Sequence, residues 1–138
     1  MFMKMNSMIN NFSVVIPVFN EEEIFLESAD KIFNICQEMN MPFEIIFSEN
    51  GSLDNTKNLI HAFIEDKDNC FTINSNYANY GLALKNGFEI AKNDIVISFD
   101  IDYFSKKFLK QSLELDEDIV ALAVSYTHLT LPTIGCVG

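Results

Sequence analysis

Residues 12–19 read FSVVIPVF, a nearly continuous apolar run that is rich in β-branched side chains. Such runs are typical of a parallel strand that is buried on both faces. Residues 21–39 follow with apolar side chains at helical spacing and open on Glu21, Glu22 and Glu23, which the positive end of a helix dipole would favour. This part of the chain therefore predicts a buried strand followed by a helix.

The same alternation continues along the chain. We expect further strands over residues 43–48, 70–74, 94–99 and 119–123, and further helices over residues 54–66, 81–91 and 105–115. Ser52 or Asp54 is the expected N-cap of the helix over residues 54–66. Strand–helix–strand repetition at this spacing implies right-handed crossovers. The predicted fold class is α/β, with a mostly parallel, Rossmann-like sheet and flanking helices.

Length and composition narrow the possible functions. The chain has 138 residues, enough for one small domain or a piece of a larger one. Nine basic and 20 acidic residues give a net charge of −11, which argues against a nucleic acid or an anionic membrane as the main partner. The three cysteines form no CxxC pair, so we expect neither a disulfide framework nor a zinc site. Cys36 and Cys70 lie in apolar stretches and are expected to be small core residues.

The two ends of the chain differ in character from the middle. Residues 1–8 lack the long apolar run and the cleavage site of a signal peptide. Residues 124–133 read VSYTHLTLPT and resemble the translation, in one frame, of a transposon adapter used in preparing sequencing libraries. We therefore expect residues 1–11 to be an N-terminal extension and residues 124–138 a non-native tail; a natural threonine-rich strand and loop is the alternative.

Polar side chains follow three of the predicted strands. Phe19-Asn20-Glu21 follows the first, Glu49-Asn50-Gly51-Ser52 the second, and Asp100-Ile101-Asp102 the strand over residues 94–99. Ligands of open parallel sheets bind at the carboxyl ends of the strands. The three clusters are therefore expected to meet at one edge of the sheet.

Asp100 and Asp102 are the most informative pair. In an extended segment, residues two apart point to the same side. Two neighbouring carboxylates repel each other, and a divalent cation relieves that repulsion; oxygen ligands suit Mg²⁺ or Mn²⁺. The hypothesis is a metal site, and a solvated loop is its alternative.

The other two clusters allow a binding and a structural interpretation. Glu49 directly follows an apolar strand, and its carboxylate could accept a hydrogen bond from a base or a ribose. Pro17 lacks an N–H group and is expected to end regular strand pairing. Phe19 is expected either to stack on a base or to pack in the core. The three glutamates Glu21–Glu23 are more typical of a solvated helix start than of a catalytic set.

Two further features of the sequence are less informative about function. Small residues at Gly81, Ala83 and Gly87 would let a helix approach a ligand, another helix or the sheet closely. His61 and His128 have no plausible serine, cysteine or metal partner, so neither is assigned a catalytic role.

Together these elements resemble the family 2 inverting glycosyltransferases of the GT-A fold, which include dolichol-phosphate mannosyltransferase. The likeness covers residues 12–123 and rests on VVIPVFNE (residues 14–21), the acidic turn within residues 43–56, the small-residue helix over residues 81–87, and residues 94–102. The acidic turn departs from the family pattern, because Glu-Asn-Gly-Ser stands where Asp-Asp-Gly-Ser is usual. The resemblance implies that residues 12–123 are the donor-binding portion of a GT-A domain.

The resemblance also implies roles for particular residues. Pro17, Phe19, Glu21, Glu49 and Asp100 would bind the nucleotide sugar, a UDP- or GDP-sugar. Asp100 and Asp102 would hold Mg²⁺ or Mn²⁺.

The implied reaction is metal-assisted transfer of the sugar, with inversion, to a glycan or polyprenyl-phosphate acceptor during the synthesis of a cell-envelope polysaccharide or glycolipid. The implied location is cytoplasmic, with attachment of the full-length enzyme to the inner face of the membrane left open. Family members continue beyond this point and carry the general base there, so we expect this chain to be incomplete and inactive alone.

A second function class competes with this one. An acidic receiver-like signalling domain is also a small α/β fold that gathers carboxylates around Mg²⁺. It would place an acidic pair after the first strand and a phosphoacceptor aspartate after the third, where Asn20-Glu21 and Asn74-Ser75-Asn76 fit poorly.

Overall fold

The computed structural model describes residues 11–114 and 121–122 of the chain. Its elements are β1 (Phe12–Val18), α2 (Phe25–Gln37), β2 (Phe43–Glu49), α3 (Thr56–Ile64), β3 (Cys70–Asn74), α4 (Tyr80–Ile90), β4 (Ile95–Ser98), α5 (Lys106–Leu113) and β5 (Ala121–Leu122). Every strand and helix expected from the sequence is present, with ends shifted by a few residues. Residues 1–10 of the expected N-terminal extension and the tail expected over residues 124–138 lie outside the described residues.

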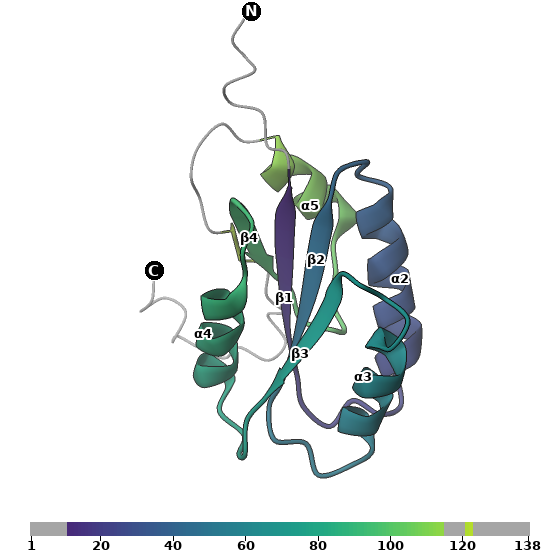
Figure 1. Cartoon of the computed structure of the whole chain (residues 1–138), viewed down its shortest axis with the longest axis vertical. Coiled ribbons are helices and arrows are strands. Elements are labelled where there is room, and N and C mark those ends of the chain that lie inside the picture. Colours follow the sequence, from purple (N-terminus) through teal and green to yellow (C-terminus); the bar gives the residue numbers. More distant parts are fainter. Residues whose placement is uncertain (1–10, 115–120, 123–138) are drawn as a thin grey trace, which may run out of the picture.

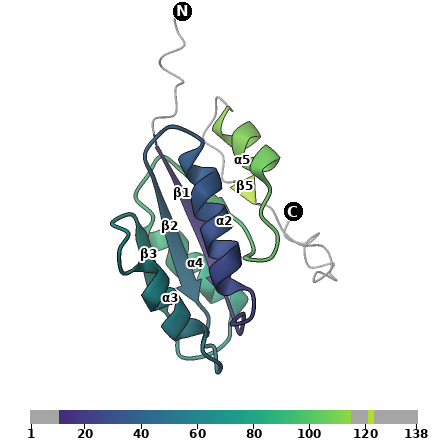
Figure 2. The same cartoon turned by 90° about the vertical axis from the view of Figure 1, so that its right-hand side faces the viewer.

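The five strands form one sheet in the order β3-β2-β1-β4-β5, and every neighbouring pair is parallel. Figure 1 shows α4 on one side of the sheet and α2 and α3 on the other. The turned view in Figure 2 places α5 on the same side as α2. The order 3-2-1-4-5 is that of a Rossmann-like fold, whereas receiver-like domains have the order 2-1-3-4-5. The topology therefore confirms the predicted α/β class and contradicts the receiver-like alternative.

The main core lies between the sheet and the layer of α2, α3 and α5. Alternate residues of β1 face it, beginning with Phe12 and Val14, and both are fully buried. Phe25, Phe47 and Phe63 meet edge to face at its centre, with ring centroids 5.2–6.0 Å apart. Aromatic pairs in this arrangement stabilise a core beyond the area that they bury.

The face of the sheet that packs against α4 carries more polar side chains than the face that packs against α2 and α3. Gly87 of α4 lies directly on the Val15 side chain of β1, so that an added Cβ would overlap it. The Ser48 hydroxyl of β2 donates to the Ala83 carbonyl of α4 at 2.6 Å. The small residues at 83 and 87 thus pack α4 against the sheet, as one of the sequence interpretations held.

Two of the predicted helix starts are wrong. The first helix begins at Phe25 rather than Glu21: the Glu21 carbonyl accepts from the Phe25 N–H at 2.8 Å, while the N–H groups of Glu21 and Glu22 donate to side chains of the loop after β2. The N-cap position of α3 is Asn55 rather than Ser52 or Asp54, but the Asn55 side chain makes no capping hydrogen bond, and the Asp54 carboxylate accepts from the Thr56 N–H at 2.9 Å.

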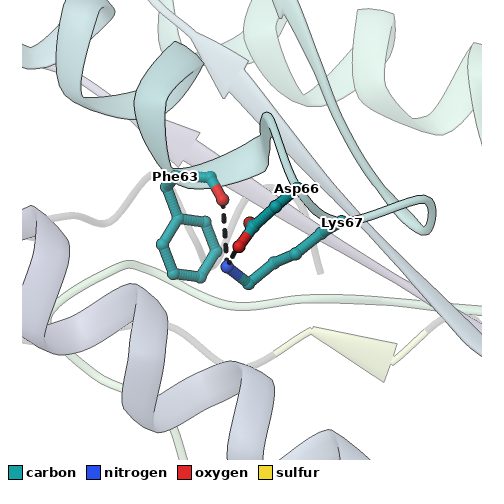
Figure 3. A network of polar contacts seen from close by, with 3 residues as sticks. All are labelled: Phe63, Asp66 and Lys67. Atoms are coloured by element: carbon teal, nitrogen blue, oxygen red, sulfur yellow. Dashed lines mark hydrogen bonds and ion pairs between the residues drawn. The ribbon is translucent and has the colours of Figure 1, made fainter.

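A lysine caps the C-terminal end of α3. Lys67 Nζ donates to the Phe63 carbonyl at 3.0 Å, pairs with the Asp66 carboxylate at 3.1 Å and lies 4.0 Å from the centroid of the Phe63 ring (Figure 3). A cation at a helix C-terminus satisfies terminal carbonyls and interacts favourably with the dipole. Hydrogen bonding and charge from Lys67 lower the pKa of Asp66.

The two described cysteines are buried and free, as expected. Burial raises the pKa of the Cys36 thiol well above its ordinary range and that of Cys70 to about 12. Both thiols are therefore protonated near neutral pH.

Candidate functional site

Strand register brings the three predicted polar clusters to the same edge of the sheet. Val18 at the end of β1 pairs with Glu49 at the end of β2, and Val15 pairs with Ser98 at the end of β4. Because β1 lies between β2 and β4, the segments that follow these strands are neighbours. The expectation that the clusters meet at the carboxyl edge is confirmed.

Pro17 ends strand pairing on one side only. In a parallel strand, the backbone groups of alternate residues point to opposite neighbours. The Val15 carbonyl accepts from Phe99 on the β4 side, so Pro17 faces β4 as well, and the β1–β4 ladder stops at Val15. Pairing of β1 with β2 continues to Val18, which corrects the expectation that Pro17 ends it.

The loop after β1 and the loop after β2 are joined by hydrogen bonds. Asn20 has a positive φ of 50°, and its Oδ1 accepts from the Leu53 N–H at 2.8 Å. The Asn20 N–H donates to the Ser52 hydroxyl at 2.9 Å, and the Glu21 N–H donates to Thr56 Oγ1 at 2.8 Å. The two clusters therefore form a single double-loop unit, which we call the paired loops (residues 19–22 and 49–56).

Asp54 adds a charged anchor to the paired loops. Desolvation is the largest influence and raises the pKa of its carboxyl. The carboxyl also accepts hydrogen bonds from the hydroxyl and N–H of Thr56 and from the Glu22 N–H. Each of these effects is smaller than desolvation, but their sum is larger, so the net result is a lowered pKa. The ionised carboxylate is the form that these donors favour.

The Glu49 side chain folds back onto the loop that follows it. Its side chain is only 1% exposed, and its carboxylate oxygens accept from the N–H groups of Gly51 and Ser52. Gly51 makes this turn possible with a φ of 75°. The carboxylate thus shapes the loop at the edge of the sheet, while Phe19 is 39% exposed on the neighbouring loop.

A second contact joins the paired loops to the start of α4. The buried Asn50 side chain accepts from the Asn79 N–H at 2.6 Å. Asn79 in turn caps α4, since its Oδ1 accepts from the Leu82 N–H at 3.0 Å. The amide at position 50 thus places the first residue of α4, Tyr80, beside the segment that follows β4.

Asp100 and Asp102 lie in a tight turn rather than an extended segment. The Tyr103 N–H donates to the Asp100 carbonyl at 3.1 Å, and Ile101 between the two aspartates is buried. The predicted extended geometry is therefore wrong, because burial of Ile101 and closure of the turn bend the backbone.

The Asp100 carboxylate contacts the start of α4. Tyr80 Oη donates to Asp100 Oδ1 at 3.0 Å. Burial, the Asp100 carboxylate with its hydrogen bond, and the Asp102 carboxylate raise the pKa of the Tyr80 phenol. The hydrogen bond therefore turns the Asp100 carboxylate toward the start of α4.

This pair fits a hard divalent cation. Carboxylate oxygens are the ligands that Mg²⁺ and Mn²⁺ prefer, and these ions usually share their shell with water and substrate phosphates. Within residues 11–114 and 121–122, no group of three or more His, Cys, Asp or Glu side chains could hold a metal by itself. A cation bound by the two aspartates would draw its other ligands from water and a phosphate.

Large apolar side chains are exposed around the same edge. They follow four different strands and comprise Phe19, Leu53, Tyr77, Tyr80 and Tyr103. Sequence reasoning missed Tyr80, although an aromatic residue directly before Gly81, at the start of a helix expected at the ligand edge, was a usable signal.

Comparison with known families agrees with this geometry. Residues 13–127 match the model of glycosyl transferase family 2. The chain belongs to this family. Among family 2 relatives, the undecaprenyl-phosphate 4-deoxy-4-formamido-L-arabinose transferase of Proteus mirabilis (strain HI4320) is 34% identical over 97 residues, which cover 68% of the chain and 29% of that relative.

Two further relatives carry the same name. That of Serratia proteamaculans (strain 568) is 34% identical over 97 residues, with the same coverage. That of Yersinia pestis (strain Pestoides F) is 33% identical over 103 residues, which cover 72% of the chain and 31% of the relative. The chain therefore spans about 30% of the length of the curated relatives that it matches.

Two other findings concern the surroundings of the site. No helix within the described part of the chain is both long enough and apolar enough to cross a bilayer. A surface hollow lies away from the carboxyl edge, between the C-terminal end of α2 and α5, and is lined by Glu38, Met39, Asn40, Met41, Lys106, Lys110, Leu113 and Glu114.

Proposed function

We propose that this chain is the donor-binding part of a glycosyltransferase that moves a sugar from a nucleotide-diphospho-sugar to an acceptor with inversion. The observation that carries the proposal is the position of Asp100 and Asp102. Both follow β4 at the carboxyl edge of a family 2 sheet, and Asp100 contacts Tyr80 at the start of α4.

The donor would lie across this edge, with its nucleotide on the paired loops and its diphosphate toward the aspartates. Phe19 offers an exposed ring and Glu21 a carboxylate on the first loop, while Pro17 and Glu49 hold the ends of β1 and β2 in shape. The N-terminus of α4 adds the positive end of a helix dipole on the diphosphate side.

Asp100 and Asp102 would hold Mg²⁺ or Mn²⁺ against the diphosphate. The bound cation would supply stabilisation of the negative charge that develops on the leaving nucleoside diphosphate. The aspartates would hold the cation in position, and the paired loops would orient the nucleotide.

The relatives' names include an undecaprenyl-phosphate acceptor, and we extend this to a polyprenyl phosphate for the whole protein, with a glycan as the alternative. A lipid phosphate attacks the sugar without a general base, whereas a glycan hydroxyl needs one. We further propose that the reaction belongs to the synthesis of a cell-envelope glycolipid or polysaccharide and takes place on the cytoplasmic side, at the inner face of the membrane.

The experiment is titration calorimetry of the 138-residue chain with UDP and with GDP, each in the presence and absence of Mn²⁺. We expect one nucleotide to bind, and to bind more tightly when Mn²⁺ is present. Asp100→Asn and Asp102→Asn are expected to remove the effect of Mn²⁺.

Asp94→Asn is the matched control, because it removes one exposed carboxylate at the opposite end of β4. It is expected to bind like the parent chain. Unchanged binding in both edge variants would rule out the metal assignment, and absence of nucleotide binding in the parent chain would count against a donor site.

A further inference from the structure

The Tyr80 phenol links the predicted metal ligands to the nucleotide side of the site. Tyr80 is the first residue of α4, and its hydroxyl donates to Asp100 Oδ1 at 3.0 Å. Tyr80 as a whole residue is 46% exposed. A hydrogen-bond donor on one oxygen restricts how the carboxylate can rotate.

The backbone of Tyr80 is itself held in place. The residue before it, Asn79, donates its N–H to the buried Asn50 side chain at 2.6 Å and caps α4. The Asn50 N–H donates to the Val18 carbonyl at 2.8 Å. Three hydrogen bonds, joined by the covalent structure of Asn50 and of Asn79-Tyr80, therefore connect the end of β1 through the loop after β2 and the start of α4 to Asp100.

We propose that Tyr80 is a positioning residue, which orients the Asp100 carboxylate for the divalent cation and thereby couples the metal position to the paired loops. This inference rests on the proposed function, because it assumes that Asp100 binds the cation. It goes beyond that function by assigning a role to a residue outside the Asp-x-Asp pair.

The test compares Tyr80→Phe with Tyr77→Phe in the 138-residue chain. Tyr77 is a matched control, since it lies three residues earlier and is 60% exposed at the same edge. Mn²⁺ binding is measured from the electron paramagnetic resonance signal of free Mn²⁺, alone and with saturating UDP or GDP. Melting temperature is recorded for each variant.

We expect Tyr80→Phe to weaken Mn²⁺ binding by about tenfold, as is typical when a hydrogen-bond partner of a metal ligand is lost. Tyr77→Phe should stay within about twofold of the parent chain, and the two variants should melt at similar temperatures. A purely structural role would instead lower the melting temperature of Tyr80→Phe and leave its Mn²⁺ affinity unchanged.

The outcomes separate this inference from the proposed function. If Asp100→Asn abolishes Mn²⁺ binding while Tyr80→Phe binds like the parent chain, the positioning role is refuted and the metal site stands. Equal weakening in Tyr80→Phe and Tyr77→Phe also refutes the positioning role. If the parent chain binds no Mn²⁺ even with nucleotide, the proposed metal site and the role of Tyr80 both fall.

Discussion

Gly51→Ala is expected to destabilise the fold strongly, because two separate costs meet at this position. Gly51 has a φ of 75°, a conformation that costs a residue with a Cβ about 1–2 kcal/mol. An added Cβ would also lie 2.7 Å from the Tyr77 carbonyl carbon and 2.8 Å from its Cα. These are backbone atoms of the loop after β3, so the overlap cannot be relieved by a side-chain rotation.

Overpacking of this kind costs about 1–3 kcal/mol, which brings the total to about 2–5 kcal/mol. For a domain of this size, even the lower figure corresponds to a fall in Tm of about 8 °C. Thermal unfolding followed by circular dichroism measures the shift, and urea denaturation gives the free energy of unfolding independently.

Gly81→Ala is the matched control. Gly81 has an ordinary φ, and its added Cβ would meet only Asn79 Oδ1, at a normal contact distance of 3.7 Å. Because alanine favours a helix over glycine, its Tm should be unchanged or higher. If Gly51→Ala melted within about 2 °C of the parent chain, the loop after β2 would not be locked against the loop after β3, and the reasoning would be refuted.

Three further outcomes are expected. Glu44→Ala should lower the free energy of unfolding in urea by about 1–3 kcal/mol, because a buried hydroxyl and a backbone N–H lose their acceptor; a loss below about 0.5 kcal/mol would contradict this. The lowered pKa of Asp54 stabilises the fold above its ordinary value of 3.8, and this contribution is lost as the pH falls through the folded value. Asp54→Asn should therefore flatten the fall in Tm below about pH 4, and an unchanged acid profile would argue against the lowered pKa. In a Cys136→Ser variant, Ellman's reagent should react with Cys36 and Cys70 only after unfolding, since burial keeps both thiols protonated; fast reaction in the folded protein would show that they are accessible.

The site shows where reasoning from sequence reaches its limit. Asp100 and Asp102 were selected as candidate ligands because carboxylates directly after an apolar strand are unusual, and the parallel sheet places such residues at the ligand edge. Their extended geometry was predicted wrongly, since the burial of Ile101 bends the chain into a turn. Tyr80 escaped notice because its role depends on a residue 20 positions away.

Glu49 illustrates the same limit from the other direction. Its place after the second strand marked it as a candidate nucleotide ligand, and that role stays a prediction. The structure adds that its carboxylate accepts from the N–H groups of its own turn, an arrangement that depends on the positive φ of Gly51. Similarly, the N–H groups of Glu21 and Glu22 pair with side chains more than 30 residues away, and local signals contain no information about these partners.

Local patterns alone determined the alternation of strands and helices, the parallel sheet and the edge to which polar residues are carried, because apolar periodicity depends only on neighbours along the chain. Strand order, the cross-linking of the paired loops and the contact of Tyr80 with Asp100 were decided by tertiary structure. These features depend on which distant backbone and side-chain groups meet once the sheet has formed. Patterns among residues that are close in the sequence contain no information about such pairings.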